Sequence, residues 1–470
     1  HLGGLCRSGV KRLLIVFTLL SLVPIWAFPY PALQDYPQHL FQARVVADPA
    51  AHPQYQVNLA PTYSVFYLVT SSLSRFLPLD VAGRAAVSLY LLLMALAAWR
   101  LARPSNWGAL LLFPVCYNQF YFLGLLNYIY AFPILLLALL DLEASKVSWR
   151  LPLWLLALLF AHPFGLLVYL GVVILWAVLT RERKYLIALA AGSLVFGLWY
   201  LSQQTTPYGR TGVHFLGLGY NLRFLATFFT NTGWEASTDW STLALWVVAV
   251  VILARCALKE GTLPGVRMAA AAVAGGLLMG LVGPWGLGGM NFALGQRLSI
   301  VAFLFLPVLA SRVIVRGLWA FTLVAVAVSL VLLSDSKQYR ISREIATIRP
   351  LIAQMEPGQA VLPLMFDQGY SDESDYYFYQ PHLHDVFYYH IATGGVAGSL
   401  WSAGTLPVDF KTGQRPAAPE PYFPNQFDWR HHAHFRYYLV RGGDEQVDRY
   451  MAFAARLVGR SGPWRLYERR

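Results

Sequence analysis

The segment 33–40 carries residue types that can do acid–base chemistry. It reads Leu-Gln-Asp-Tyr-Pro-Gln-His-Leu and begins shortly after an apolar run that ends at Phe28. Asp35 and His39 are four residues apart, so they would share the first turn of a helix. A carboxylate at the lipid–water boundary can act as a general base on a hydroxyl group. A structural alternative is equally open, in which Asp35 is the N-cap of that helix and Pro37 lies in its first turn.

Apolar residues recur at helical spacing after Asp35, at Tyr36, Leu40, Ala43 and Ala47. This spacing predicts an amphipathic helix lying on the membrane surface. Such a helix would hold the carboxylate at the outer face of the membrane.

Composition indicates an α-helical polytopic membrane protein. Hydrophobic residues make up 57% of the 470 residues and charged residues 13%, about half of the ~25% charged content of soluble domains. The net charge of +12 fits Lys and Arg in cytoplasmic loops. Because no basic stripe is interleaved with aromatics, no nucleic-acid partner is expected. Membrane lipid is the expected surrounding.

Apolar blocks predict about eleven transmembrane helices. The first, 13–28, follows Arg7, Lys11 and Arg12 and is expected to be an uncleaved span with a cytoplasmic N-terminus. Eleven crossings then make the C-terminal region extracytoplasmic. The remaining blocks are 62–77, 81–99, 107–123, 126–141, 152–179, 185–201, 241–257, 268–284, 297–315 and 317–333.

Two regions are expected. Residues 1–334 form the transmembrane domain with long outer loops at 30–61 and 203–239, and residues 335–470 form a small extracytoplasmic α/β domain. Within the second region, Val361–Met365 and Tyr437–Val440 have the pattern of strands, and residues 443–459 have helical spacing.

The layout resembles the GT-C glycosyltransferases, the superfamily of protein O-mannosyltransferases and the lipid A aminoarabinose transferase. An acidic residue, Asp35, follows the first span in a long outer loop with a predicted surface helix. The resemblance extends to Leu-Asn127-Tyr-Ile-Tyr-Ala-Phe-Pro133, Ala-His162-Pro-Phe-Gly165 and Arg436-Tyr-Tyr-Leu-Val-Arg441-Gly.

This resemblance implies an inverting hexosyltransferase in a bacterial cytoplasmic (inner) membrane. Its donor would be a polyprenyl-phosphate-linked sugar, its acceptor a hydroxyl of a glycan, lipid or protein, and Asp35 would take the acceptor's proton. Many members have paired acids in the first loop, whereas Gln34 and Tyr36 flank a single Asp here. That difference favours a reaction without a metal cofactor.

A leaving phosphate needs a cation at the outer face. Gln296 and Arg297 follow a Gly-rich loop at the outer end of the tenth span, and arginine can bind phosphate bidentately. The alternative is an interfacial arginine that reaches the headgroups. Further substrate-binding candidates lie in the large outer loop, at Arg210 and His214.

Other polar residues have both a functional and a structural interpretation. Glu235 and Asp239 precede the eighth span, where either could be a second acid, hold an acceptor amine, or be a solvated loop residue. Asn127 and His162 lie within apolar blocks, where polar groups often serve binding. Asn127 could instead satisfy backbone near Gly124, and His162 could fill the gap opened by Pro163. Histidines and an aspartate also cluster in the C-terminal region, but their spacing matches no standard metal site. They are His382, His384, Asp385, His390, His431, His432 and His434.

Three alternatives to a glycosyltransferase remain. A transporter or lipid flippase would place ionisable residues at mid-membrane and show related halves, whereas this sequence has almost no acidic residue in the span interiors and no evident repeat. An O-antigen ligase or polymerase would depend on Arg210 and His214 rather than on Asp35. A non-catalytic assembly subunit is the third. P-loop, dinucleotide-binding and standard hydrolase motifs are absent from the sequence.

Overall fold

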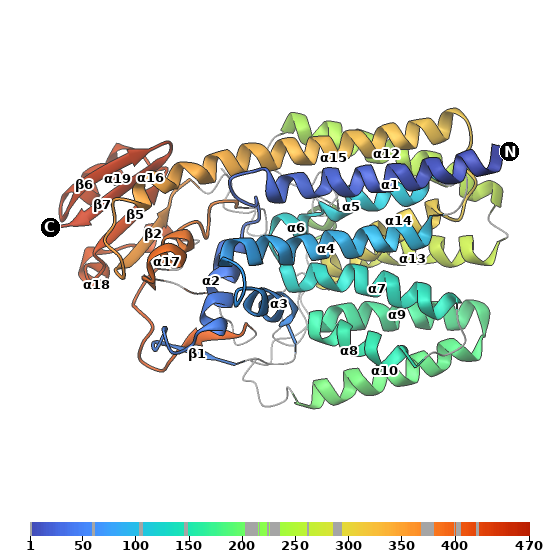
Figure 1. Ribbon diagram of the computed structural model, residues 1–470, viewed down its shortest axis with the longest axis horizontal. Coiled ribbons are helices and arrows are strands. Elements are labelled where there is room, and N and C mark those ends of the chain that lie inside the picture. The colour runs from blue at the N-terminus through green and yellow to red at the C-terminus, as the bar shows by residue number, and fades with distance from the viewer. Residues whose placement is uncertain are drawn as a thin grey trace. The chain divides into compact units, whose positions relative to one another are not determined.

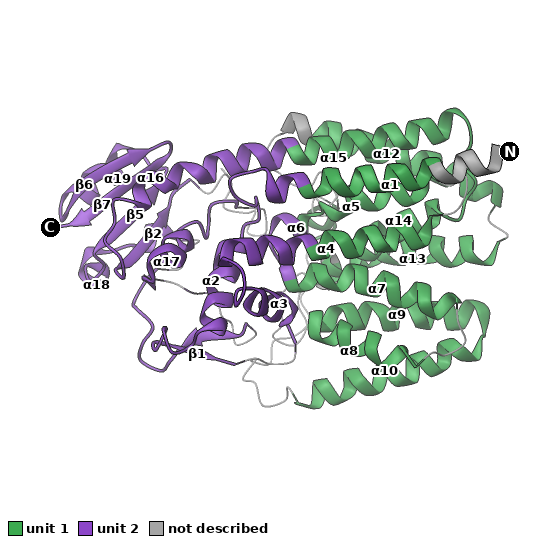
Figure 2. Ribbon diagram, viewed as in Figure 1, with its two compact units in different colours: residues 1–22, 89–119, 127–335 green, residues 23–88, 120–126, 336–470 purple. Residues whose placement is uncertain are grey.

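The computed structural model forms two compact units (Figure 2). Unit 1 consists of residues 1–22, 89–119 and 127–335, and unit 2 of residues 23–88, 120–126 and 336–470. The structure describes residues 2–58, 62–102, 107–144, 149–202, 215, 217–222, 225, 236–260, 263–284, 294–367, 380–398, 400, 406–419 and 423–470.

Unit 1 is a helical bundle whose long helices lie side by side (Figure 1). Long apolar runs form helices in a bilayer because backbone groups must be satisfied within each segment. Its helices are α1 (Leu2–Trp26), α4 (Leu79–Leu101), η1 (Gly108–Leu111), α5 (Leu112–Cys116), α7 (Leu126–Ala144), α8 (Leu151–Ala161), α9 (Pro163–Thr180), α10 (Arg183–Ser202), α12 (Ala236–Glu260), α13 (Pro264–Val282), α14 (Leu294–Ala310) and α15 (Leu318–Ile345). Of these, α1 and α15 end in unit 2, and α4 and α7 begin there.

The chain is a multi-pass membrane protein. Within the described residues, eight helices are long and apolar enough to cross a membrane, and two shorter apolar helices accompany them. The expected count of eleven is therefore not confirmed. Block 62–77 contains only the nine-residue helix α3 (Val65–Leu73), too short to cross. Block 152–179 is divided at His162, because Pro163 lacks the N–H that would continue α8.

Unit 2 contains a five-stranded mixed sheet in the order β3-β2-β5-β7-β6, which confirms a small C-terminal α/β region. β2 pairs in parallel with β3 and β5, while β7 pairs antiparallel with β5 and β6. The strands are β2 (Ala360–Met365), β3 (Val396–Ala397), β5 (Tyr437–Arg441), β6 (Ala455–Ser461) and β7 (Trp464–Arg469). The helices of unit 2 are α2 (Tyr36–Ala47), α3, α6 (Gln119–Phe122, which begins in unit 1), η2 (Ala346–Ile348), α16 (Arg349–Ile352), α17 (Phe387–Thr393), η3 (Pro424–Gln426), α18 (Trp429–His432) and α19 (Glu445–Ala452).

The loop after the first span folds with the C-terminal residues. β1 (Tyr55–Val57) pairs antiparallel with β4 (Val408–Phe410), and Phe41 packs in the same core cluster as Tyr389. The predicted helix after Asp35 is present as α2, but it lacks the exposed polar face expected of an amphipathic helix, and its location at the membrane surface stays a prediction. Nine of its twelve residues are buried, including its polar ones Gln38, His39 and Gln42, because α3 and α17 pack against it.

Candidate active site

The carboxylate of Asp35 lies at the N-cap position of α2 but makes no capping hydrogen bond. Its Oδ1 atom instead lies 3.3 Å from Nε2 of His384, and its side chain is 21% exposed. The structural alternative, a carboxylate occupied in capping the helix, is therefore not what this side chain does. The Asp35 carboxylate is partly exposed, and one of its oxygens lies beside the imidazole of His384.

Backbone contacts fix the position of Asp35. Its N–H donates to the carbonyl of Leu123 (3.2 Å), and the N–H of Gln34 donates to that of Phe122 (2.9 Å). Gly124 adopts a φ of +75°, and a Cβ there would lie 2.7 Å from the Asp35 nitrogen. Only glycine permits both this conformation and this approach. These backbone hydrogen bonds thus position Asp35 without occupying its carboxylate.

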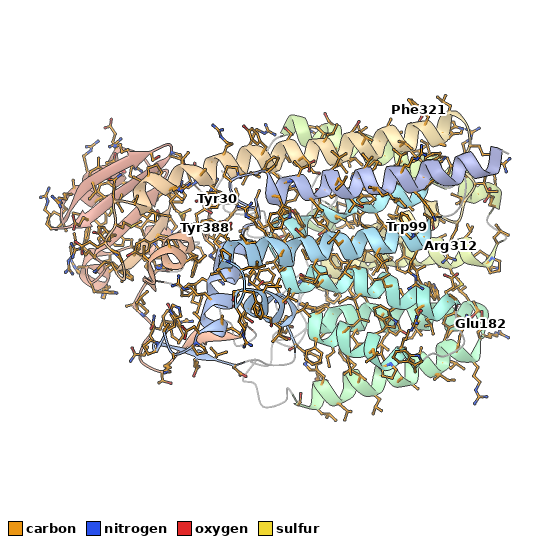
Figure 3. All side chains as sticks on the ribbon, in the orientation of Figure 1. Tyr30, Trp99, Glu182, Arg312, Phe321 and Tyr388 are labelled. Carbon is orange, nitrogen blue, oxygen red and sulfur yellow. The ribbon has the colours of Figure 1, made fainter. Side chains whose placement is uncertain are left out.

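Side chains also connect Asp35 to the segment 380–384. Oε1 of Gln34 accepts a hydrogen bond from the N–H of Gln380 (2.6 Å), and Nε2 of Gln34 donates to Oδ1 of Asp35 (3.3 Å). The rings of Tyr30 and Tyr388 lie 4.5 Å apart, centroid to centroid (Figure 3). These contacts bring His384 to the carboxylate from a distant part of the chain.

His39 lies one helical turn after Asp35 and is buried. Its Nδ1 lies 2.5 Å from the hydroxyl of Tyr67, and its ring packs against that of Phe66. Burial lowers the pKa of His39 to about 4, so the imidazole is neutral near pH 7. Its ring contacts Tyr67 and Phe66 of α3, it also makes a hydrogen bond with the backbone of Gly124, and its catalytic role stays a prediction.

The predicted histidine cluster is split by the fold. His384 contacts Asp35, whereas Nδ1 of His382 lies 2.8 Å from Oδ2 of Asp385, and its Nε2 lies 3.5 Å from Glu344. Burial favours the neutral form of His382, but the hydrogen bond and negative charge of Asp385, together with Glu344, outweigh burial and raise the pKa. Arg441 pairs with the other oxygen of Glu344. Within the described residues, no group of three or more His, Cys, Asp or Glu side chains is arranged to hold a metal ion.

A second cluster, in unit 1, surrounds Arg297. Its guanidinium carbon lies 5.2 Å from the ring centroid of Tyr128 and 5.6 Å from that of Phe164. The Tyr128 hydroxyl donates to the Arg297 carbonyl (2.8 Å), and Nη1 lies 3.5 Å from Nε2 of His162. Tyr128, Phe164 and Arg297 stand near the first residues of α7, α9 and α14, so three helix N-termini meet here. Their partial positive charges add to that of the arginine.

His162 caps α9, since its Nδ1 accepts a hydrogen bond from the N–H of Phe164 (3.1 Å). In the neutral tautomer that this bond implies, Nε2 carries the proton. Two donors, the Nε2–H of His162 and the guanidinium of Arg297, therefore face each other. An anionic oxygen could accept from both, so the arrangement suits a phosphate.

The other sequence candidates are less well placed or lie outside the description. Asn127 is buried in the first turn of α7. Gln296 and Asp239 belong to α14 and α12, and their side chains are not among those described. Arg210, His214 and Glu235 lie outside the described residues.

Sequence reasoning missed His384 as a partner of Asp35 and the aromatic rings around Arg297. Tyr128 and Phe164 stand in the two quoted segments next to Asn127 and His162, so the signal was present. For His384 no local signal exists, because its partner is far away in the chain.

Comparison with known proteins identifies a solved structure of similar fold. No protein-family model matches the chain, and no curated protein sequence does. Among solved structures the chain is similar to the crystal structure of ArnT from Cupriavidus metallidurans bound to undecaprenyl phosphate. The identity is 12%, the match covers 97% of this chain and 98% of that one, and the TM-score is 0.54. The chain is thus a membrane protein with the GT-C fold, as the sequence predicted. The particular fold it shares is that of ArnT.

Proposed function

We propose that this protein is a glycosyltransferase of the bacterial cytoplasmic membrane that uses a polyprenyl-phosphate-linked sugar. The acceptor is a hydroxyl group at the outer face, and Asp35 is the general base. One observation carries the proposal. The Asp35 carboxylate stands at a helix N-cap without capping it, partly exposed, with an oxygen held by His384.

The reaction makes one bond and breaks one. The acceptor oxygen attacks the anomeric carbon of the donor sugar, and the bond from that carbon to the phosphate oxygen breaks. Polyprenyl phosphate leaves with the bonding electrons, and the hydroxyl proton passes to Asp35. General-base help of this kind contributes roughly 10²–10⁴-fold to a rate. Attack opposite the leaving group inverts the anomeric centre.

The donor phosphate is assigned to the cluster of Arg297, Tyr128 and His162. Charge develops on the phosphate as the glycosidic bond breaks, and fixed donors stabilise it without reorganising. Arginine and the N-termini of α7, α9 and α14 supply such donors and dipoles. The ArnT structure of the same fold is bound to undecaprenyl phosphate, which supports a polyprenyl-phosphate ligand.

His384 is a positioning residue in this proposal. Nε2 of His384 lies 3.3 Å from Oδ1 of Asp35, and in this proposal the contact fixes the carboxylate rotamer and leaves the other oxygen for the acceptor hydroxyl. Gln34, which donates to the same oxygen, supports this orientation.

The test is donor consumption by the purified protein in lipid, with a panel of polyprenyl-phosphate sugars and candidate acceptors. We expect one donor to be consumed by the wild type and Asp35→Asn to lower its transfer rate at least ~100-fold. Asp80→Asn is the matched control, because Asp80 is an exposed carboxylate of the same unit whose one ion-pair partner among the described residues is Arg84. Equal rates in Asp35→Asn and the wild type would refute the assignment of the base.

A further inference from the structure

A cavity of about 440 Å³ lies in unit 1 at the end opposite the Arg297 cluster. Arg297 is in the first turn of α14, whereas the cavity wall includes Ile314, which lies beyond the C-terminal end of that helix at Ala310. The last two turns of α12 form another part of the wall. The cavity is lined by Ile252, Arg255, Cys256, Lys259, Glu260, Ile314, Arg316 and Trp319.

The lining carries an excess of positive charge. It contains three basic side chains and one carboxylate, and that carboxylate, of Glu260, accepts the N–H of Ile314 (3.1 and 3.2 Å to its two oxygens). In the part of the chain that the structure describes, Arg255, Lys259 and Arg316 form no ion pair. Three cations around a cavity favour an anionic ligand.

Neighbouring basic residues at the same end of unit 1 behave differently. Arg312 makes a bidentate pair with Glu143, at 2.7 Å through Nη1, and Arg100 and Arg150 both lie near Asp141 (Figure 3 labels Arg312). Some basic residues at this end of unit 1 therefore have carboxylate partners, whereas the three that line the cavity have none among the described residues.

The surface that leads to the cavity is apolar. Val247, Val251, Arg255 and Lys259 follow one another at intervals of four, so they share one face of α12. Val247 and Val251 are 52% and 60% exposed. Trp319 stands under the guanidinium of Arg255, 6.0 Å from it, and indoles favour the headgroup level of a bilayer. An apolar stripe that ends in two cations matches a lipid with acyl chains and an anionic head.

We infer that this cavity binds the headgroup phosphate of an anionic membrane lipid. The phosphate oxygens accept from Arg255, Lys259 and Arg316, and the acyl chains lie along Val247 and Val251 of α12. The cytoplasmic N-terminus predicted from the sequence would put the site in the cytoplasmic leaflet, where anionic lipids attract basic residues. It is separate from the donor site and does not rest on the proposed function.

The experiment is a lipid titration of the purified, delipidated protein, followed by native mass spectrometry. Phosphatidylglycerol and phosphatidylethanolamine are the probes. We expect phosphatidylglycerol to bind at least tenfold more tightly, and Arg255→Gln/Lys259→Gln/Arg316→Gln to abolish that preference. The control is Arg12→Gln/Arg181→Gln/Arg183→Gln, which removes three exposed positive charges of unit 1 outside the cavity. It should keep the preference, and the melting temperature of each variant checks its fold.

Three results would overturn the inference. Equal affinity for the two lipids in the wild type removes the anionic site. An equal loss of preference in both triple variants assigns the effect to net charge. Displacement of phosphatidylglycerol by millimolar inorganic phosphate, together with equal affinity for phosphatidylglycerol and phosphatidylethanolamine, would make the ligand a soluble anion and not a lipid. Retained preference in the control, with phosphate ineffective, supports the lipid site.

Discussion

The two candidate clusters are built in different ways. In unit 1, Arg297 and the aromatic residues that contact it belong to helices. Tyr128, Phe164 and Arg297 all lie near helix N-termini. In unit 2, Asp35 is held by irregular segments, through the backbone of residues 122–124 and the side chain of His384. The cationic cluster uses dipoles that every helix has, whereas the acidic cluster depends on individual contacts.

This difference suggests a division of roles. Helix dipoles and a cation stabilise bound negative charge in the ground state and in the transition state. A base must be placed to within fractions of an ångström of a proton, so small shifts change the rate more than the affinity. Variants in unit 1 should therefore act mainly on donor affinity, and variants around Asp35 mainly on the transfer rate.

Arg297→Ala should have the largest effect on donor affinity. Charge-assisted hydrogen bonds are worth about 1.5–3 kcal/mol, so the donor Kd should rise roughly 10–150-fold. Arg297→Lys keeps the charge and should lose less. Titration of the donor into each variant measures this. An unchanged Kd in Arg297→Ala would remove the residue from the donor site and break the division of roles.

His384→Ala should lower the transfer rate at saturating donor about tenfold while the donor Kd stays within twofold. The carboxylate would lose the group that orients it but remain a base. His384→Gln, which can still donate a hydrogen bond, should recover part of the rate. His431→Ala is the control, because His431 is exposed and pairs with Asp428. A rise in Kd instead of a fall in rate would count against a positioning role.

Gly124→Ala should slow transfer several-fold by displacing the backbone of Asp35. Its cost has two parts, the strain of a φ of +75° and the contact with the Asp35 nitrogen. Gly413→Ala separates them, because Gly413 has the same φ with no atom within 4 Å of its Cβ position. Both variants should lose about 1–2 kcal/mol of stability from strain. Only Gly124→Ala should lose rate, and equal rates in the two would show that this contact does not place the base.

Acid should destabilise unit 2. Burial lowers the pKa of His39 to about 4 and that of His390 to about 3. A lowered pKa in the folded state gives stability that is complete above the unfolded value, near 6.5, and is lost as the pH falls toward 4. The raised pKa of His382 acts in the opposite sense, with stability present below pH 6.5 and lost as the pH rises through the folded value.

Thermal unfolding between pH 7 and pH 4 measures this balance. We expect the melting temperature of the wild type to fall as the pH is lowered. The His390→Phe variant should show a smaller fall, because the His390 ring packs among Phe41, Phe387 and Tyr389. An identical pH profile in His390→Phe and the wild type would contradict a buried neutral histidine at this position.

Regular hydrophobic patterns in the sequence predicted the features that depend on local residue spacing. Long apolar blocks gave the membrane class, and helical spacing gave α2. The burial of α2 could not be predicted, because α17, which packs on it, lies more than 300 residues later in the chain. Asp35 and Arg297 stood out through their residue type and location. His384 did not, since its place beside Asp35 depends on the Gln34–Gln380 hydrogen bond and other long-range contacts.

Single-turnover transfer by Asp35→Asn, with donor binding measured on the same sample, tests the central claim most directly. The account predicts a donor Kd within about threefold of the wild type and a transfer rate lowered at least ~100-fold. Wild-type transfer in Asp35→Asn would contradict a base at Asp35. Loss of donor binding with an intact fold would mean that Asp35 holds the donor instead of activating the acceptor.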